Sequence, residues 1–232
     1  MKKILTLFFF IFILSSCWNS EKSISFSEAS GICYMENQDI FYVVSDEWEI
    51  QKINSNLKKL EYFQFDKKYD FEAIICDEWN NLLLTINEET WKIYKIDLKN
   101  NFKIINKYKI KWYKVEKKWI EWFTKVWKNK YIISTQTKEE NLLILDFTDN
   151  EFKIIKKINF LYNDLSWLSF YNGLLYIISD KNDKIFVYNL ENNKIIKSID
   201  LKKWDWEGIS FDKKWNLFLT DDKWRIVKLN ME

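Results

Sequence analysis

Short runs of alternating apolar and polar residues follow one another from about residue 24 to the end of the chain. The last three such runs, Gly208 to Phe211, Leu217 to Thr220 and Arg225 to Leu229, are separated by short polar connections. A period of two residues places every second side chain on the same face, which is typical of β-strands. No stretch after residue 17 shows the 3.6-residue period of a helix. The pattern therefore predicts an all-β domain.

The runs belong to five similar segments, which begin at Glu28, Asp70, Trp119, Asp164 and Asp205. Successive segments start 42, 49, 45 and 41 residues apart. A repeat of about 40 to 50 residues that contains four short strands is typical of a β-propeller blade. We predict a propeller of five blades over residues 24–232, with six blades as the alternative if a linking segment contains a degenerate unit. The last segment lacks a fourth strand, which residues 23–27 (SISFS) are expected to supply, so that pairing of the two chain ends closes the ring.

The first 16 residues differ from the rest of the chain. Two lysines at positions 2 and 3 precede an apolar run at 4–14 that is short for a membrane span, and this is typical of an export signal. Residues 14–17 (LSSC) resemble the lipobox of bacterial lipoproteins, in which the cysteine is lipidated and becomes the mature N-terminus. We predict a signal peptide at 1–16, lipidation of Cys17, a tether at 17–23, and an extracytoplasmic domain anchored to the cell membrane or the outer membrane. An ordinary signal peptide with an incidental cysteine is the alternative.

The charge balance argues against nucleic acid as a partner. The chain has 36 Lys and Arg against 34 Asp and Glu, and residues 1–16 contain two of the lysines and no acidic residue. The remainder is neutral and lacks the basic excess of a nucleic-acid-binding domain. The expected partners are the membrane, through the lipid anchor, and an unidentified small molecule or envelope protein. Cys33 and Cys76 lie on runs interpreted as inner strands of neighbouring blades, where buried free thiols are favoured over a disulfide.

Tryptophan and glycine alternate at equivalent positions of the repeats. The chain has 13 Trp, 3 Gly and no Pro, although tight hairpin turns usually need glycine. Gly173 occupies the turn position that holds Trp215 in the last segment, and Gly208 occupies the inner-run position that holds Trp167. Trp79 and Trp127 occupy the same turn position in the second and third segments. Gly31 and Trp122 occupy the same inner-run position in the first and third segments.

Codon usage offers an explanation, because UGA is read as glycine in some bacterial lineages and is translated as tryptophan under other code tables. We interpret eleven tryptophans as glycines in the cell: Trp18, Trp48, Trp79, Trp91, Trp119, Trp122, Trp127, Trp167, Trp204, Trp215 and Trp224. Adding these eleven to the 3 present glycines gives 14 of 232 residues, or 6%, which is close to the average glycine content of about 7%. Trp206 is expected to be genuine, because the other segments have apolar residues at its position. A tryptophan surface that stacks on sugars is the alternative.

With these positions written as glycine, several motifs closely resemble the SdiA-regulated (YjiK-like) family of bacterial proteins. The motifs are EASGI at 28, DFEAI at 70, GIEGF at 119, DLSGLSFYNGLLYIISD at 164 and DWEGISFDKKGNLFL at 205. The resemblance covers about residues 24–230. It implies a β-propeller outside the cytoplasm and attaches no firm reaction, so it supports fold and location more than chemistry.

The expected site lies on one face of the propeller, because the loops that lead into the inner strands and those that leave the second strands surround the same end of the channel. The residues at the start of the inner runs are the predicted ligand-binding residues: Ser30, Glu72, Glu121, Ser166 and Glu207. Acidic residues at the ends of the second runs are candidate metal ligands: Asp46, Glu88, Asp180 and Asp221. Oxygen ligands without His or Cys suit Ca²⁺ rather than zinc or copper. The alternative is that these Ser and Glu side chains hydrogen-bond the backbone of the next blade.

Two functions fit this site. The first is a non-enzymatic ligand-binding or interaction module in the cell envelope, with Ca²⁺ at the acidic end of the channel. The second is a metal-dependent hydrolase of lactones or esters, in which a metal polarises a carbonyl and a carboxylate such as Glu121 or Glu207 activates water. The chain has no histidine, which excludes Ser-His-Asp and Cys-His nucleophile systems. The sequence leaves open whether the protein is an enzyme.

Overall fold

The computed structural model describes residues 22–230, except residues 88, 89, 91, 112–118, 137–140, 161, 163, 164 and 222 and the side chains of residues 119, 121, 135, 136 and 141. The described residues form twenty β-strands and two short 3-10 helices, η1 (Glu36–Gln38) and η2 (Leu98–Asn100). The prediction of an all-β domain is confirmed. The predicted signal peptide, Cys17 and most of the tether lie outside the described residues. In the described part of the chain, no helix is long and apolar enough to cross a membrane.

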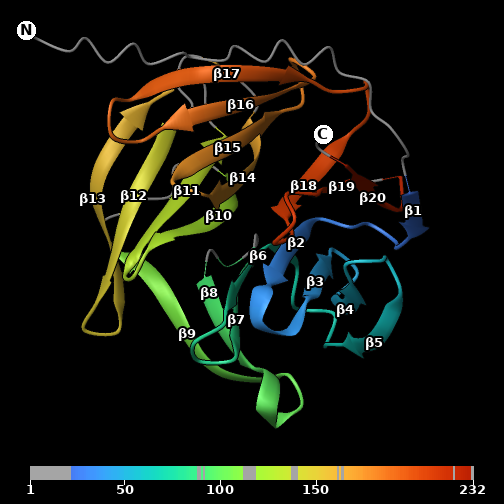
Figure 1. Cartoon of the computed structure of the whole chain (residues 1–232). Coiled ribbons are helices and arrows are strands. Elements are labelled where there is room, and N and C mark those ends of the chain that lie inside the picture. The colour runs from blue at the N-terminus through green and yellow to red at the C-terminus, as the bar shows by residue number, and fades with distance from the viewer. Residues whose placement is uncertain are drawn as a thin grey trace, which may run out of the picture.

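The strands form five blades of four strands each around a central axis (Figure 1). Blade 1 contains β2 (Gly31–Met35), β3 (Ile40–Ser45), β4 (Glu49–Asn54) and β5 (Lys59–Gln64). Blade 2 contains β6 (Phe71–Asp77), β7 (Leu82–Asn87), β8 (Lys92–Asp97) and β9 (Lys103–Lys111). Blade 3 contains β10 (Trp119–Trp127), β11 (Lys130–Gln136), β12 (Asn141–Thr148) and β13 (Glu151–Asn159). Blade 4 contains β14 (Leu165–Tyr171), β15 (Leu174–Ser179), β16 (Lys184–Asn189) and β17 (Lys194–Asp200). Blade 5 contains β18 (Trp206–Phe211), β19 (Leu217–Asp221), β20 (Arg225–Leu229) and, from the other end of the chain, β1 (Lys22–Ser25).

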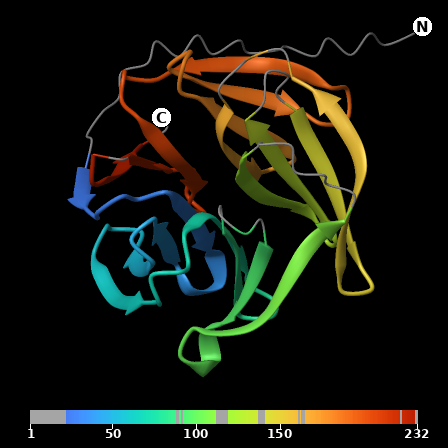
Figure 2. The ribbon, with the colours of Figure 1, turned by 180° about the vertical axis from the view of Figure 1, so that it is seen from behind.

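The ring is closed. The inner strands β2, β6, β10, β14 and β18 each contact the inner strands on both sides, including β18 against β2, and the view from behind shows the same circular order (Figure 2). β1 pairs antiparallel with β20, from Lys22 opposite Lys228 to Ser25 opposite Arg225. The prediction of five blades closed by the chain ends is therefore confirmed. Blades 2 and 3 also join at their outer strands, where β9 and β13 pair in parallel at Ile110 and Phe152.

Aromatic residues fill the spaces between blades. Six aromatic residues of the second and third strands are buried: Phe41, Tyr42, Tyr94, Tyr131, Tyr176 and Phe218. The rings of Phe41 and Phe218 join blades 1 and 5 with centroids 4.0 Å apart, and those of Tyr176 and Phe211 join blades 4 and 5 at 4.5 Å. Such contacts add to the area that each ring buries, so the blade interfaces carry much of the apolar core.

A disulfide links the first two inner strands. Cys33 in β2 and Cys76 in β6 are bonded, with their Cα atoms 5.6 Å apart. The prediction that these residues lie on neighbouring inner strands is confirmed, but the prediction of free thiols is wrong. The two strands pack side by side around the axis, and their separation at this level lies within the range that a disulfide spans.

Removal of β1 should destabilise the ring. A chain that begins at Phe26 leaves β20 as an unpaired edge and uncovers the apolar surface on which Ile24 packs. We expect a melting temperature several degrees below that of a chain that begins at residue 21, together with concentration-dependent association through the free edge. Thermal melting and size-exclusion chromatography measure both effects. Equal melting temperatures and a monomeric truncated chain would show that closure by β1 is dispensable.

Candidate functional site

Four of the five inner strands have a β-bulge at the same level. In β6, Phe71 pairs with Asn87 and Ala73 pairs with Ile86, which leaves Glu72 as the extra residue of the bulge. The registers of β10, β14 and β18 place Glu121, Ser166 and Glu207 in the same position. In blade 1, Ser30 comes directly before β2. A bulge redirects the side chain of its extra residue and is often found beside a binding site. The predicted ligand-binding residues therefore share one level of the ring.

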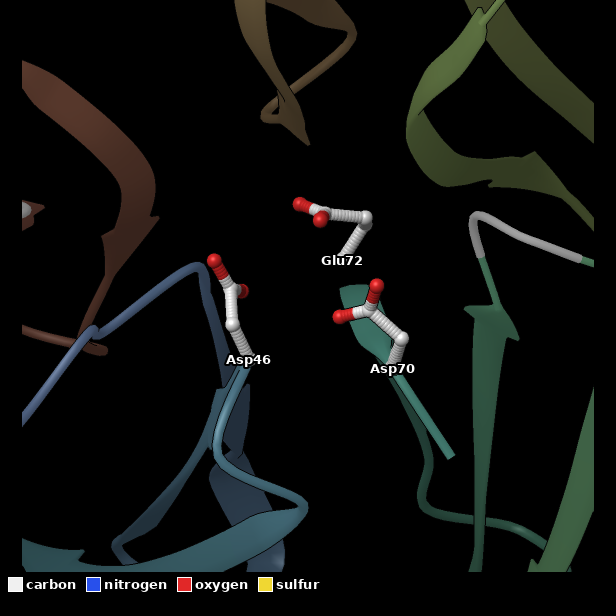
Figure 3. A group of neighbouring side chains, drawn as sticks. All are labelled: Asp46, Asp70 and Glu72. Carbon is white, nitrogen blue, oxygen red and sulfur yellow. The ribbon is translucent and has the colours of Figure 1, made fainter. Parts of the chain in front are cut away.

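Three carboxylates from blades 1 and 2 come together at this level. Asp46 follows β3, Asp70 precedes β6 and Glu72 is the bulge residue of β6; each offers an oxygen, and these oxygens lie within 4.8 Å of one another. The three side chains are half-buried and point into a common space (Figure 3). We call Asp46, Asp70 and Glu72 the acidic mouth. Carboxylate oxygens in this number and spacing are suited to a hard divalent cation such as Ca²⁺.

Ser30 has a structural contact. Its Oγ donates a 2.9 Å hydrogen bond to the carbonyl oxygen of Phe71 in the next blade. A hydrogen bond to the backbone of the next blade is the alternative role that the sequence left open for these residues. For Ser30 the structure shows this hydrogen bond. Ser166 differs, because its side chain is buried and its Oγ has no hydrogen-bond partner within the described residues.

Within the described residues, the candidate metal ligands Asp180 and Asp221 are not part of the acidic mouth. Asp221 is fully buried, and its carboxylate accepts hydrogen bonds from the Arg225 guanidinium and from the Arg225 backbone N–H. The guanidinium also stacks on Trp204, with its central carbon 3.8 Å from the ring centroid. This pairing gives Asp221 a structural role in blade 5. Asp180 and Glu207 are half-buried on other blades. Glu88 and the side chain of Glu121 lie outside the described residues.

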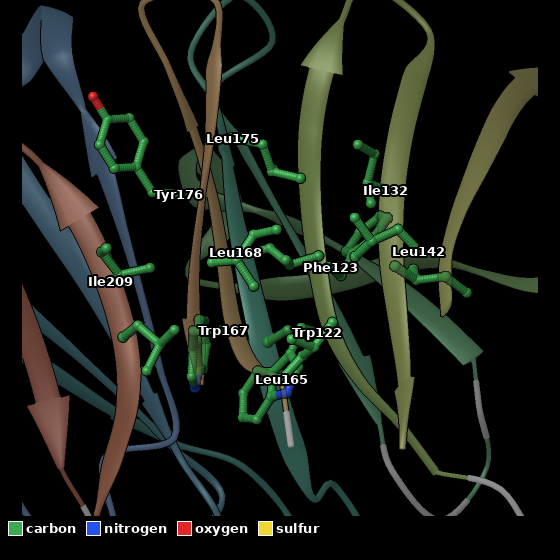
Figure 4. Close-up of a cluster of buried hydrophobic side chains, with 14 of the residues drawn as sticks. Trp122, Phe123, Ile132, Leu142, Leu165, Trp167, Leu168, Leu175, Tyr176 and Ile209 are labelled. Carbon is green, nitrogen blue, oxygen red and sulfur yellow. The ribbon is translucent and has the colours of Figure 1, made fainter. Parts of the chain in front are cut away.

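Two indoles lie in the channel at the level just past the bulges. Trp122 and Trp167 are buried, and their ring centroids are 4.2 Å apart (Figure 4). A Cβ atom placed on Gly31 would lie 2.9 Å from Cη2 of Trp167 and 3.1 Å from the carbonyl oxygen of Glu72. The Trp167 ring therefore reaches blade 1 close to the backbone of the acidic mouth, and the two indoles occupy the channel there.

A cavity that the sequence did not predict lies toward the other end of the channel. It has a volume of about 990 Å³, and its polar lining includes Tyr34, Asp77, Lys125 and Tyr171. Lys125 from blade 3 pairs with Asp77 from blade 2 at 3.4 Å. Burial, together with the charge of Asp77, raises the pKa of the nearby Tyr131 to about 12. We call this the exit cavity, because it lies where the inner strands end.

The sequence contained a weak signal for the exit cavity. Thr124, Ser169 and Ser210 are polar residues two positions after Trp122, Trp167 and Gly208 on three inner strands, and all three line the cavity. A repeated polar residue on an otherwise apolar inner strand indicates a position that faces a channel rather than a blade interface. The Asp77–Lys125 pair joins blades 2 and 3, and no repeated pattern in the sequence indicated it.

Tyr34 and Asp39 give a pH-dependent prediction at the edge of this cavity. The Tyr34 hydroxyl donates a 2.7 Å hydrogen bond to Asp39, Ser55 donates a second at 2.9 Å, and the bond from Tyr34 is the main cause that lowers the pKa of Asp39. A lowered pKa in the folded state stabilises the protein above the unfolded-state pKa, and this contribution is lost as the pH falls through the folded-state value.

Tyr34→Phe should therefore raise the pKa of Asp39 and lower the free energy of unfolding at pH 7 by about 1 kcal/mol. The difference from the unchanged protein should shrink as the pH falls below the ordinary pKa of Asp39, 3.8. Urea unfolding at pH 7 and pH 3, with an NMR titration of the Asp39 carboxyl, measures both quantities. An Asp39 pKa that is the same in both proteins would contradict the assignment.

Comparison with known proteins supports the fold and leaves the chemistry open. No family model and no curated protein sequence matches the chain. Among solved structures the chain is similar to a glutaminyl cyclase from Myxococcus xanthus, with a TM-score of 0.68 and 11% sequence identity over 90% of this chain and 94% of that one. At this identity the likeness shows the fold alone, and one fold serves many functions.

Proposed function

We propose that this protein is a ligand-binding module of the bacterial cell envelope, in which the acidic mouth binds Ca²⁺. The observation that carries the proposal is the convergence of Asp46, Asp70 and Glu72 from two adjacent blades within 4.8 Å. The β-propeller fold supports a binding or interaction role in general, since the blades hold loop residues around one axis. The bulge at Glu72 and the disulfide between β2 and β6 support a fixed arrangement of the three carboxylates.

Calcium leaves room for a ligand at this position. Ca²⁺ takes about six to eight oxygen ligands, and three carboxylates fill only part of this shell even where some bind through both oxygens. The open positions would accept water or the oxygens of a small molecule or of a partner protein. The cation would also join blades 1 and 2, because Asp46 belongs to the first and the other two ligands belong to the second.

Membrane attachment and family are part of the same proposal. The lipobox at residues 14–17 supports export and lipidation of Cys17, and the repeated motifs support membership of the SdiA-regulated family. Cys17→Ser should move the protein from the detergent phase to the aqueous phase in a partitioning assay of expressing cells. Equal partitioning of the two proteins would remove the lipid anchor from the proposal.

A calcium titration followed by thermal melting tests the site. Binding to the folded state at 100 times Kd stabilises by about 2.7 kcal/mol, which for a chain of this size raises the melting temperature by about 5 to 10 °C. We expect this rise for the unchanged protein and none for Asp70→Asn or Glu72→Gln. Glu61→Gln is the matched control, because Glu61 is an acidic residue on the outer strand β5, paired with Lys52. No rise in the unchanged protein, or the same rise in all variants, would overturn the calcium site.

Hydrolysis of lactones or esters is the second candidate function. It needs a metal at the acidic mouth and a carboxylate base, for which Glu121 and Glu207 are the candidates from the sequence. Calcium-dependent turnover of a lactone and ester panel that is lost in Glu207→Gln would establish it. The panel should include a peptide with an N-terminal glutamine, because the similar solved structure is a glutaminyl cyclase. No turnover on any substrate would leave the binding function alone.

A further inference from the structure

The turn between the second and third strands has a left-handed residue just before the third strand. In blades 1, 4 and 5 this residue is Trp48, Asp183 and Trp224, with φ angles of 64°, 47° and 68°. Asn, Asp and above all Gly adopt positive φ readily, whereas bulky side chains resist it. Among the residues that the structure describes, 14 non-glycine residues have positive φ; eight of them are Asn or Asp, and three are tryptophan. Asp183 follows the usual preference, and the two tryptophans violate it.

The turn between the inner and second strands shows the same substitution. Leu175 pairs with Phe170 in blade 4, and Leu217 pairs with Phe211 in blade 5, so Gly173 and Trp215 occupy equivalent positions two residues earlier. Their φ angles are 79° and 66°. The backbone of blade 5 therefore has a conformation that glycine provides in blade 4. In blade 2 the left-handed residue is Asn81, so the expected equivalence of Trp79 with Gly173 is wrong.

The inner strands provide an independent observation. The residue after the bulge is glycine in β18 and tryptophan in β10 and β14, with Gly208 opposite Thr220, Trp122 opposite Ser134 and Trp167 opposite Ile178. A Cβ atom on Gly208 would lie 2.1 Å from Oγ1 of Thr220, so a side chain at this position would require Thr220 to move. At the same level, blades 3 and 4 each have a tryptophan, which has the largest of all side chains.

Several buried polar atoms near this level have no hydrogen-bond partner within the described residues. Nε1 of Trp167 is buried and has no hydrogen-bond partner in the described residues, and the same is true of the hydroxyls of Ser134 and Ser166 on the same two blades. Buried polar groups normally have partners, because desolvation without a hydrogen bond is unfavourable. Water could satisfy the two hydroxyls if the indoles were absent.

From these observations we propose that Trp48, Trp122, Trp167, Trp215 and Trp224 are glycine in the native protein, encoded by UGA in an organism that reads this codon as glycine. Three tight turns, at positions 48, 215 and 224, and the channel level past the bulges would then have glycine, as at Gly31, Gly173 and Gly208. The channel below the acidic mouth would lose both indoles and extend toward the exit cavity. This consequence concerns the depth of the site and is independent of whether the site binds calcium.

Trp206 supplies an internal control. The register places it at the position of Phe71, Ile120 and Leu165, all of them buried and apolar. Its own ring is buried, and its Nε1 donates a 2.9 Å hydrogen bond to the carbonyl oxygen of Lys202. A large apolar residue with a satisfied polar group is the ordinary state of a buried tryptophan. Trp206 should therefore be tryptophan in the native protein as well.

Peptide mass spectrometry of the protein purified from its own cells tests the proposal. Trypsin should release residues 215–223, which contain Trp215 alone among the tryptophans, and residues 204–213, which contain Trp206. We expect residues 215–223 to be lighter by the difference between a tryptophan and a glycine residue, and fragmentation to show tryptophan at 206. Residues 158–181 should show the same mass loss at position 167. A tryptophan mass as the main species at 215 and 167 overturns the proposal, whatever the calcium titration shows.

Discussion

Cys33→Ala combined with Cys76→Ala should lower the free energy of unfolding by about 4 kcal/mol. The disulfide joins residues 43 positions apart, and the loss of chain entropy in the unfolded state when a loop of this length is closed has about this value at 25 °C. The bond also joins the inner strands of the two blades that supply the acidic mouth. The double variant should therefore bind calcium more weakly than the unchanged protein.

Urea unfolding with and without a reducing agent measures this effect. Reduction should destabilise the unchanged protein by a similar amount and should leave the double variant unaffected, which separates loss of the bond from loss of packing by the side chains. If the double variant unfolds at the same urea concentration as the oxidised protein, the disulfide contributes nothing to stability.

Glycine at positions 48, 215 and 224 together should raise the free energy of unfolding by about 2 kcal/mol. Each left-handed L-residue costs about 1 to 2 kcal/mol, and the greater freedom of glycine in the unfolded chain offsets about 0.5 to 1 kcal/mol of this. Burial of the indole rings contributes little stabilisation in return, because the side chains of Trp215 and Trp224 are 44% and 56% exposed. Their main contacts are one edge contact with Tyr171 and one hydrogen bond to Glu28.

Trp206→Gly is the matched control, because it makes the same chemical change at a buried site. It should lower the free energy of unfolding by about 3 to 5 kcal/mol, the usual cost of deleting a large buried ring. Chemical denaturation of the unchanged protein, the triple-glycine variant and Trp206→Gly gives the comparison. A triple-glycine variant that is less stable than the unchanged protein would show that the turns accommodate tryptophan, and sugar stacking would become the better explanation for these residues.

The repeat period was sufficient to predict the architecture. Offsets of 41 to 49 residues between equivalent acidic or serine positions located all five inner strands, and the incomplete last segment indicated the closure by β1. The bulge residues were also identifiable, because Glu72, Ser166 and Glu207 break the alternation at the same point. Such features repeat in the sequence because each blade packs against its neighbours in the same way.

Contacts that occur once were harder to predict. Cys33 lies two residues after Gly31, whereas Cys76 lies three residues after Ala73, so alignment of the repeats places the two cysteines at different levels of their strands. The twist and packing of β2 against β6 bring them together. Asp221 was assigned as a candidate metal ligand from its repeat position, but blade 5 alone has an arginine, Arg225, at the start of its third strand to pair with it.

The most direct test of the proposed function is a crystal structure of the protein grown with calcium. We predict an anomalous difference peak between Asp46, Asp70 and Glu72, with carboxylate oxygens about 2.3 to 2.6 Å from the ion. The remaining ligands should be water or a small molecule. A structure at the same calcium concentration with no peak there, or with calcium bound only elsewhere, would contradict the assignment of the acidic mouth as a cation site.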